Sequence, residues 1–451
     1  MAKKPATRYV CSNCGQPSTT YSGRCPHCGE WNTLEEQLTS TALGAVSSGG
    51  RILQVADVAS VAKNPEKRIM SGIDEVDTVL GGGVVPGSVT LLAGQPGIGK
   101  STLLLQVAHA LSGNAKVLYV SGEESAHQVA SRAKRLGADA QRMDLATSTS
   151  ADDIAATIAS GEYQVMIIDS IQTLSCAAIS SAAGSVSQIT NSTQLLTVAA
   201  KASNTALIIV GHVTKEGSIA GPKVLEHVVD VVLQLEGDRY GGFKLLRAIK
   251  NRFGTTNEAG IFEMVNEGMQ PVANPSAALL AERQVTDGSI VLATLEGTRP
   301  ILVEVQALVN KTSYGYPKRA ASGMDLNRLN LLVAMLERRT KLNLAEQDIY
   351  INIVGGIRLQ EPAADLAVCL AIGSAARGLQ LKTQAVVFGE VGLSGEVRHV
   401  PHIDKRVAEA KKMGFEAAIG PKESGRANST TSKFLQSVPD VRTALNQFLE
   451  K

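Results

Sequence analysis

The hydrophobic pattern of the chain changes between short apolar runs and stretches with a helical period. Nearly continuous apolar runs occupy residues 116–120, 165–169 and 206–210, and each predicts a buried strand. Between them, stretches such as SAHQVASRAKRLG at 125–137 place apolar residues on one face of a helix. This alternation is typical of a parallel sheet with helical crossovers, in which ligands bind outside the carboxyl ends of the strands.

The pattern differs in the later part of the chain. GGFKLLRAIKNRFG at 241–254 and DIYINIVGG at 348–356 alternate as strands. PAADLAVCLAIGSAA at 362–376 predicts an apolar-faced helix, and VVFGEVGLSGEVRHV at 386–400 predicts a hairpin that turns at a Ser-Gly pair. We therefore expect an α/β core followed by a domain of α+β type.

A glycine-rich turn joins one predicted strand to a helix. Residues 91–105 read LLAGQPGIGKSTLLL, so backbone N–H groups at the glycines can turn toward an anion at a helix N-terminus. Lys100 is expected to reach the β- and γ-phosphates of a nucleotide, and the Ser101 hydroxyl to ligate Mg²⁺. The expected ATP-binding residues are Gly94, Gln95, Pro96, Gly97, Ile98, Gly99, Lys100, Ser101 and Thr102.

Polar residues follow the other apolar runs. Asp169 ends the run VMIID, where a carboxylate can hold Mg²⁺ through water. Glu123 follows the run at 116–120 and is the expected base for the water that attacks the γ-phosphate, although its neighbour Glu124 remains an alternative. His212 follows the run at 206–210, where it is expected to sense the γ-phosphate.

Two long loops and one basic strand end add candidate cations. The loops occupy residues 170–188 and 213–227, and the second carries Lys215 and Lys223 among glycines. In a ring these loops can line a channel and hold the phosphates of a single strand. Lys250 and Arg252 end the strand at 241–254 and are expected to reach a neighbour's nucleotide, the alternative being a solvated strand end.

Four of the six cysteines lie within the first 28 residues. Cys11, Cys14, Cys25 and Cys28 form two C-x-x-C knuckles, which is the spacing of a closed, structural Zn²⁺ site. This pattern favours metal over disulfides and a reducing compartment. With no apolar run of membrane-spanning length and no signal peptide, we expect a cytoplasmic protein.

Composition limits how nucleic acid could be bound. The net charge is only +2 and aromatic residues make up 4% of the chain, so neither global steering nor a stacking platform is expected. Any contact with DNA must therefore come from local clusters of cations.

Taken together, the cysteine knuckles, GQPGIGKS, SGEES, the GHVTKEGSIAGPKVLEH loop and KNRFG resemble bacterial RadA (Sms), a family of DNA-recombination ATPases. The resemblance covers essentially the whole chain and implies a RecA-like core with the cofactors ATP, Mg²⁺ and Zn²⁺. It also implies a homo-hexameric ring on single-stranded and branched DNA, working alongside RecA recombinase in repair and stress response. In this resemblance Lys250 and Arg252 match the cations that act on a neighbouring subunit.

The C-terminal region is similar to the proteolytic domain of Lon. Lon's nucleophilic serine lies in a Gly-Pro-Ser-Ala-Gly turn, and the matching residues here are 361–365, with Ala363 at the serine position. Alanine has no hydroxyl to attack a peptide. The dyad lysine falls at Asp404, with Lys405 adjacent. We therefore expect a scaffold domain without peptidase activity.

These features predict five segments and one leading function. The segments are a Cys₄ zinc module at 1–34, a linker at 35–66, a RecA-like ATPase at 67–272, a connector at 273–288 and a Lon-like scaffold at 289–451. The leading hypothesis is an ATP-dependent DNA motor (a helicase or branch-migration enzyme) with DNA-stimulated ATPase activity. The alternatives are a non-motor, nucleotide- and zinc-dependent scaffold that docks recombination proteins on DNA, and an ATP-dependent protease.

Overall fold

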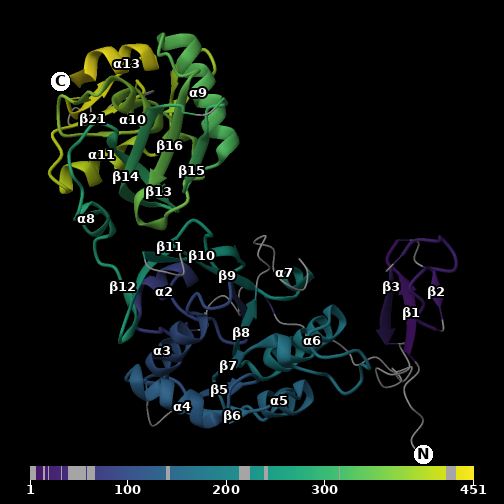
Figure 1. The fold of residues 1–451 in the computed structure, drawn as a ribbon. Coiled ribbons are helices and arrows are strands. Elements are labelled where there is room, and N and C mark those ends of the chain that lie inside the picture. The colour runs from purple at the N-terminus through teal and green to yellow at the C-terminus, as the bar shows by residue number, and fades with distance from the viewer. Residues whose placement is uncertain are drawn as a thin grey trace, which may run out of the picture. The chain divides into compact units, whose positions relative to one another are not determined.

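The structure is a computed structural model. It describes residues 7–13, 16–18, 20–31, 33–38, 57, 67–138, 143–212, 224–237, 242–313, 315–422 and 433–450. The chain divides into two compact units, Met1–Leu235 with Ala248–Thr255 and Glu236–Arg247 with Thr256–Lys451 (Figure 1).

A small antiparallel sheet begins the described chain. It consists of β1 (Thr7–Cys11), β2 (Pro17–Ser18) and β3 (Leu34–Leu38), in the order β2-β1-β3. Among its described residues, the buried core consists of Cys11, Cys25 and Leu34, with Tyr9 packed against them. So small a core supplies little folding free energy, which is the usual situation of a metal-stabilised module.

The next sheet along the chain has nine strands, in the order β12-β11-β10-β9-β4-β8-β7-β5-β6. The pairs from β9 to β6 are parallel. These strands are β4 (Val89–Gly94), β5 (Val117–Ser121), β6 (Met143–Thr147), β7 (Val165–Asp169), β8 (Ala206–His212) and β9 (Val231–Gly237). The three apolar runs of the sequence thus became β5, β7 and β8, and the predicted parallel sheet is confirmed.

Helices cross over both faces of this sheet, with α3 and α4 on one face and α5 and α6 on the other (Figure 1). They are α2 (Asp74–Leu80), α3 (Lys100–Ser112), α4 (Ala126–Arg135), α5 (Ala151–Ala159), α6 (Val186–Ser203) and α7 (Val224–Val228). Several start at a serine cap, and in α4 the caps are reciprocal, because Ser125 and Gln128 each bond the other's backbone. Each crossover therefore begins at a position that the sequence fixes locally.

Three antiparallel strands follow β9 in the chain. They are β10 (Phe243–Asn251), β11 (Ala259–Val265) and β12 (Gly268–Pro271), joined as a meander. The alternating pattern at 241–254 correctly predicted β10. The strand ends at the KNRFG motif, which is therefore placed by the direction of β10.

The second unit is built on a seven-stranded sheet in the order β15-β16-β14-β13-β18-β21-β22. These strands are β13 (Ser289–Glu296), β14 (Arg299–Lys311), β15 (Arg319–Ser322), β16 (Gln347–Ile353), β18 (Ala385–Val387), β21 (Ala417–Gly420) and β22 (Leu435–Ser437). The helices are α8 (Pro275–Leu280), α9 (Leu326–Thr340), α10 (Asp365–Arg377), α11 (Ile403–Lys412) and α13 (Val441–Phe448). The predicted α+β character of this region is confirmed.

Helix α10 is the centre of this unit. Its residues from Asp365 to Ser374 are all buried, so the helix is enclosed on every side.

The short strands β17 (Gln380–Leu381) and β23 (Leu449–Glu450) form one ladder, and β19 (Glu390–Val391) and β20 (Val397–Arg398) form the predicted hairpin. Across the described residues of both units, no helix combines the length and apolar character needed to cross a membrane.

Candidate nucleotide site and zinc module

The glycine-rich turn lies between β4 and α3, at the carboxyl edge of the sheet. Gly97 and Gly99 have φ values of +77° and +112°, which only glycine adopts without strain. A Cβ on Gly94 would lie 2.8 Å from the carbonyl oxygen of Leu235, so a side chain has no space there. The backbone thus forms an open cradle at the N-terminus of α3, as anion binding requires.

Lys100 closes this cradle from inside. Its side chain is buried, and Nζ donates to the carbonyl oxygens of Gly94 at 2.9 Å and Gln95 at 3.0 Å. Burial lowers the pKa of Lys100 to about 8, against the opposing effect of Asp169 and Glu123. An ammonium group held among carbonyl oxygens is available to exchange those partners for phosphate oxygens.

Asp169 is the last residue of β7 and is paired with Ser121 of the neighbouring strand β5. Its Oδ2 accepts a hydrogen bond of 2.7 Å from the hydroxyl of Tyr119, which is buried in β5. Burial raises the pKa of Tyr119 far above its usual value, so the phenol keeps its proton and remains a donor. This partner was not foreseen from the sequence, because only the strand register brings residues 119 and 169 together.

The two glutamates that follow β5 have different partners. Glu124 Oε1 accepts a 2.5 Å bond from Arg132 of α4, which ties it to the helix. Glu123 is exposed and accepts a short hydrogen bond from Ser170 Oγ, directly after Asp169. Its negative charge favours the charged form of Lys100 and so opposes the lowering of that pKa by burial. Of the two candidates, Glu123 has the position that a general base needs.

Other predicted residues are placed only in part. His212 is the last residue of β8 and is paired with Gly94, the first residue of the cradle. Its side chain, and both Lys215 and Lys223, lie outside the described residues. The structure therefore gives the backbone position of the expected sensor and leaves the expected DNA-contacting lysines as predictions.

Lys250 and Arg252 lie at the opposite edge of the sheet from the cradle. Arg252 Nη1 donates to Asp230 at 3.1 Å, and the other oxygen of Asp230 accepts from Val89 N, at the start of β4, at 3.1 Å. Lys250 Nζ donates to the carbonyl oxygens of Glu226 and Val229, and burial lowers its pKa, with Arg252 acting in the same sense. Both predicted cations are therefore held by acceptors of their own chain.

The zinc module brings three of the four predicted ligands together. The Sγ atoms of Cys11, Cys25 and Cys28 all lie within 4.8 Å of one another, and those of Cys11 and Cys28 are 3.6 Å apart. Tetrahedral Zn²⁺ with sulfur ligands needs sulfur atoms about 3.8 Å apart. The cluster therefore fits the metal, and Cys14, the fourth predicted ligand, lies outside the described residues.

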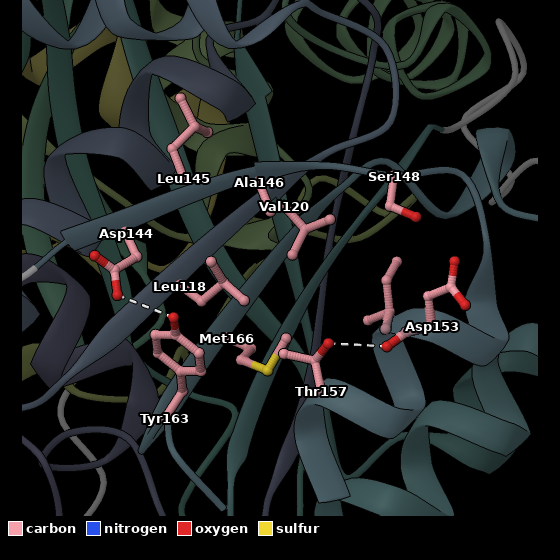
Figure 2. Close-up of a pocket in the computed structure, with 11 residues that line it drawn as sticks. Leu118, Val120, Asp144, Leu145, Ala146, Ser148, Asp153, Thr157, Tyr163 and Met166 are labelled. Atoms are coloured by element: carbon pink, nitrogen blue, oxygen red, sulfur yellow. Dashed lines mark hydrogen bonds between the residues drawn. The ribbon is translucent and has the colours of Figure 1, made fainter. Parts of the chain in front are cut away.

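A separate cavity of about 440 Å³ opens between α5 and the last strands of the sheet (Figure 2). At its rim, the Tyr163 hydroxyl donates a hydrogen bond of 2.9 Å to Asp144, and the Thr157 hydroxyl donates one to the carbonyl oxygen of Asp153. The floor of the cavity is apolar. The lining residues are Leu118, Val120, Asp144, Leu145, Ala146, Ser148, Asp153, Ile154, Thr157, Tyr163 and Met166. None belongs to the cradle, so the nucleotide site is identified by its chemistry and not by this cavity.

In the second unit, the place of the Lon-type dyad has no nucleophile. Ala363 is buried in the short turn η3 (Pro362–Ala364) before α10. The neighbouring carboxylates are engaged in ion pairs, Glu361 with the buried Arg406 and Asp365 with Arg328. Lys405 Nζ donates 3.2 Å to the carbonyl of Thr298. These contacts stabilise the fold of the second unit around the start of α10 and α11.

Three protein families match parts of the chain. The family described as "AAA domain" matches residues 58–218, "Rubredoxin metal binding domain" matches 9–36, and "Subunit ChlI of Mg-chelatase" matches 330–424. With the cradle and the cysteine cluster, these matches identify ATP and Zn²⁺ as cofactors, and Mg²⁺ usually accompanies ATP in such proteins. The expected fold class is confirmed, a zinc ribbon, a RecA-like P-loop core and a Lon-like C-terminal domain.

Curated relatives align over nearly the full length. "DNA repair protein RadA" of Listeria monocytogenes is 47% identical over 429 residues, 94% of both chains. The protein of the same name from Pseudomonas aeruginosa is 45% identical over 451 residues, 99% of this chain and 100% of that one. A solved structure, "Crystal structure of the RadB recombinase", aligns at 23% identity with a TM-score of 0.36, over 45% of this chain and 99% of that chain.

Proposed function

This chain belongs to the family of the DNA repair protein RadA, and from that premise we propose that it is an ATP-driven motor on DNA. It hydrolyses ATP, binds single-stranded and branched DNA as a homo-hexameric ring, and moves recombination intermediates alongside RecA in the cytoplasm. Helicase or branch-migration activity is the finer part of this proposal. The zinc module docks a partner or DNA, and the Lon-like unit is a scaffold without peptidase activity.

The position of Lys250 and Arg252 carries the proposal. Arg252 is held by Asp230, which also binds the N–H of Val89 at the start of β4, whereas the cradle begins at Gly94 at the end of that strand. Five residues of strand span about 17 Å. These cations therefore cannot serve the cradle of their own chain, which supports an ATP site completed by a second subunit.

Within one chain, the residues around the cradle have distinct roles. When bound, ATP with Mg²⁺ supplies the phosphoanhydride bond and the charge that the site must stabilise. Lys100 would exchange its carbonyl partners for phosphate oxygens, and Ser101 with Asp169 would hold the metal. Glu123 takes a proton from the attacking water, and the hydrogen bond from Ser170 orients the Glu123 carboxylate. Lys250 and Arg252 of a neighbouring subunit stabilise the charge that develops as the bond breaks.

A mixing experiment tests the shared site. Lys100→Ala and Arg252→Ala are each expected to abolish DNA-stimulated ATP hydrolysis. An equimolar, re-assembled mixture should regain part of the activity, because some interfaces combine an intact cradle with an intact Arg252. Activity that does not return in the mixture, while both variants still assemble, would contradict the shared site.

A scaffold without motor activity remains a second candidate, favoured by the own-chain partners of Lys250 and Arg252. In that case these cations only stabilise the strand end. The two functions differ in steady-state turnover, because a motor hydrolyses ATP continuously when single-stranded DNA is added. A scaffold would bind ATP and DNA with little stimulation of hydrolysis.

A further inference from the structure

The side chain of Gln172 is a buried polar group that the proposed function does not explain. Gln172 lies in η1 (Ile171–Thr173), one turn after Asp169. Both polar atoms of its amide, Nε2 and Oε1, are shielded from solvent, and within the described residues neither has a hydrogen-bond partner. A buried polar group without a partner costs free energy and calls for an explanation.

The turn that carries Gln172 is fixed in place. Ile171 and Leu174 on either side are completely buried in the apolar core that lines the α6 face of the sheet. Thr173 Oγ1 donates 2.8 Å to the carbonyl of Ser170, whose own hydroxyl bonds Glu123. The backbone position of Gln172 is thus linked, through Thr173 and Ser170, to the candidate base.

The amide points toward the end of β8. A Cβ built on Gly211 would lie 4.0 Å from Gln172 Nε2, so the amide stands beside the backbone of that residue. The pairing of β7 with β8 runs only to Ile168–Ile209, whereas the pairing of β4 with β8 continues to Gly94–His212. The chain has thus left β7 before the level of Gly211, and Gln172 lies beside a part of β8 that β7 does not pair.

We propose that Gln172 is a positioning residue of the nucleotide site, whose amide bonds the backbone at Gly211 and His212 when ATP fills the cradle. The inference rests on the proposed ATPase function. Because His212 is paired with Gly94, a small movement of the cradle on binding reaches the end of β8 directly. The amide gains its missing partners in that state, so the ATP-bound arrangement is favoured, and the turn at Ser170 and Glu123 is fixed at the same time.

The test replaces Gln172 by Met, which has a similar length and no hydrogen-bonding amide. Without nucleotide, Gln172→Met should raise the Tm of the full chain by about 3 °C, since an unpaired buried group is removed. The affinity for a non-hydrolysable ATP analogue should fall about tenfold, while that for ADP changes less than twofold. In hydrogen exchange, a peptide covering residues 206–212 should gain protection with the analogue in the parent protein but not in the variant.

Ser192→Ala is the matched control. Ser192 Oγ is also buried and, among the residues that the structure describes, unpartnered, but it lies on α6. This variant should show a raised Tm with unchanged analogue affinity and exchange. Gln172→Asn, which keeps the amide, serves if the Met variant does not fold, and should also lose the gain in protection because its amide falls short of β8.

Equal analogue affinity and equal protection in parent and Gln172 variants would overturn the proposal. This outcome is distinct from failure of the proposed motor function. If DNA did not stimulate hydrolysis by the parent protein, the analogue and exchange measurements, which contain no DNA, would still decide the role of Gln172.

Discussion

The hydroxyl of Tyr119 donates a 2.7 Å hydrogen bond to Oδ2 of Asp169 from the neighbouring strand. This bond fixes one oxygen of the carboxylate, Oδ2, and does not occupy the other. The carboxylate proposed to hold Mg²⁺ is therefore oriented by a buried phenol, in the manner in which outer partners commonly orient metal ligands.

Tyr119→Phe removes this orientation while keeping the ring in the core. We expect the Mg²⁺ concentration for half-maximal ATP hydrolysis to rise several-fold, since outer partners are typically worth 10-fold or more in metal affinity. The free energy of unfolding should fall by about 1.5 kcal/mol, because a hydrogen bond to a charged group is lost. Tyr163→Phe, which removes a similar bond to Asp144 away from the cradle, is the control. Equal Mg²⁺ dependence in parent and Tyr119→Phe would contradict the orienting role.

The lowered pKa of Lys100 predicts a pH dependence of stability. Below pH 8 the ammonium is charged in both the folded and unfolded states, and burying that charge destabilises the nucleotide-free fold. Between pH 8 and 10.5 the folded state has lost this proton while the unfolded chain keeps it, so the free energy of unfolding rises with pH.

Lys100→Met isolates this effect. The difference in unfolding free energy between parent and variant should shift in favour of the parent by on the order of 1 kcal/mol between pH 7.5 and pH 10. Urea unfolding of both proteins without nucleotide, at matched ionic strength, measures it. A difference that is independent of pH would show that the buried ammonium carries no such penalty.

The two glutamates after β5 should separate on substitution. Glu123→Gln is expected to lower kcat for ATP hydrolysis by 100-fold or more while nucleotide affinity stays within a few-fold, as for loss of a general base. Glu124→Gln breaks only the half-exposed pair with Arg132 and should cost about 0.5 kcal/mol in stability, with kcat nearly unchanged. Steady-state kinetics with nucleotide binding tests both variants. The reverse ranking would assign the base to Glu124.

Zinc removal should unfold one module and spare the rest. In the part of the module that the structure describes, the core consists of three buried residues, so chelation or Cys25→Ser is expected to abolish its hydrogen-exchange protection. Protection of β4 and β7 in the ATPase core should remain. Elemental analysis of the parent protein should give one Zn²⁺ per chain, and Cys14→Ser should lose the metal as Cys25→Ser does. An intact ribbon without metal would contradict a structural site.

Features that are contiguous in sequence could be predicted from it. The cradle is one uninterrupted segment whose glycines, lysine and serine lie within a single strand–turn–helix, so local chemistry is sufficient to predict this element and to name Lys100 and Ser101 as candidates. The strands that end at Asp169 and His212 are short apolar runs, which the hydrophobic pattern marks directly. The parallel order of these strands then places their ends at one edge of the sheet.

Features that depend on register or long-range packing could not be predicted in the same way. Tyr119 reads as an ordinary core residue of β5 until its register with Asp169 is known. Asp230 reads as a charge between two apolar segments, yet it binds Arg252, Lys201 and the backbone of Val89. Likewise Gln172 has no motif of its own, and only the early end of β7 gives its amide significance.

Asp230 contacts both Arg252, after the end of β10, and Val89, at the start of β4. If Arg252 is drawn to a triphosphate on the next subunit, this carboxylate keeps, among the described residues, its bonds to Lys201 and to the amide of Val89, at the start of the strand that ends in its own cradle. Binding of Arg252 at one interface would then change the contacts of Asp230 and, through Val89, affect the strand that leads to the cradle of the same chain. In the proposed ring, such an arrangement would favour sequential over simultaneous hydrolysis at neighbouring sites.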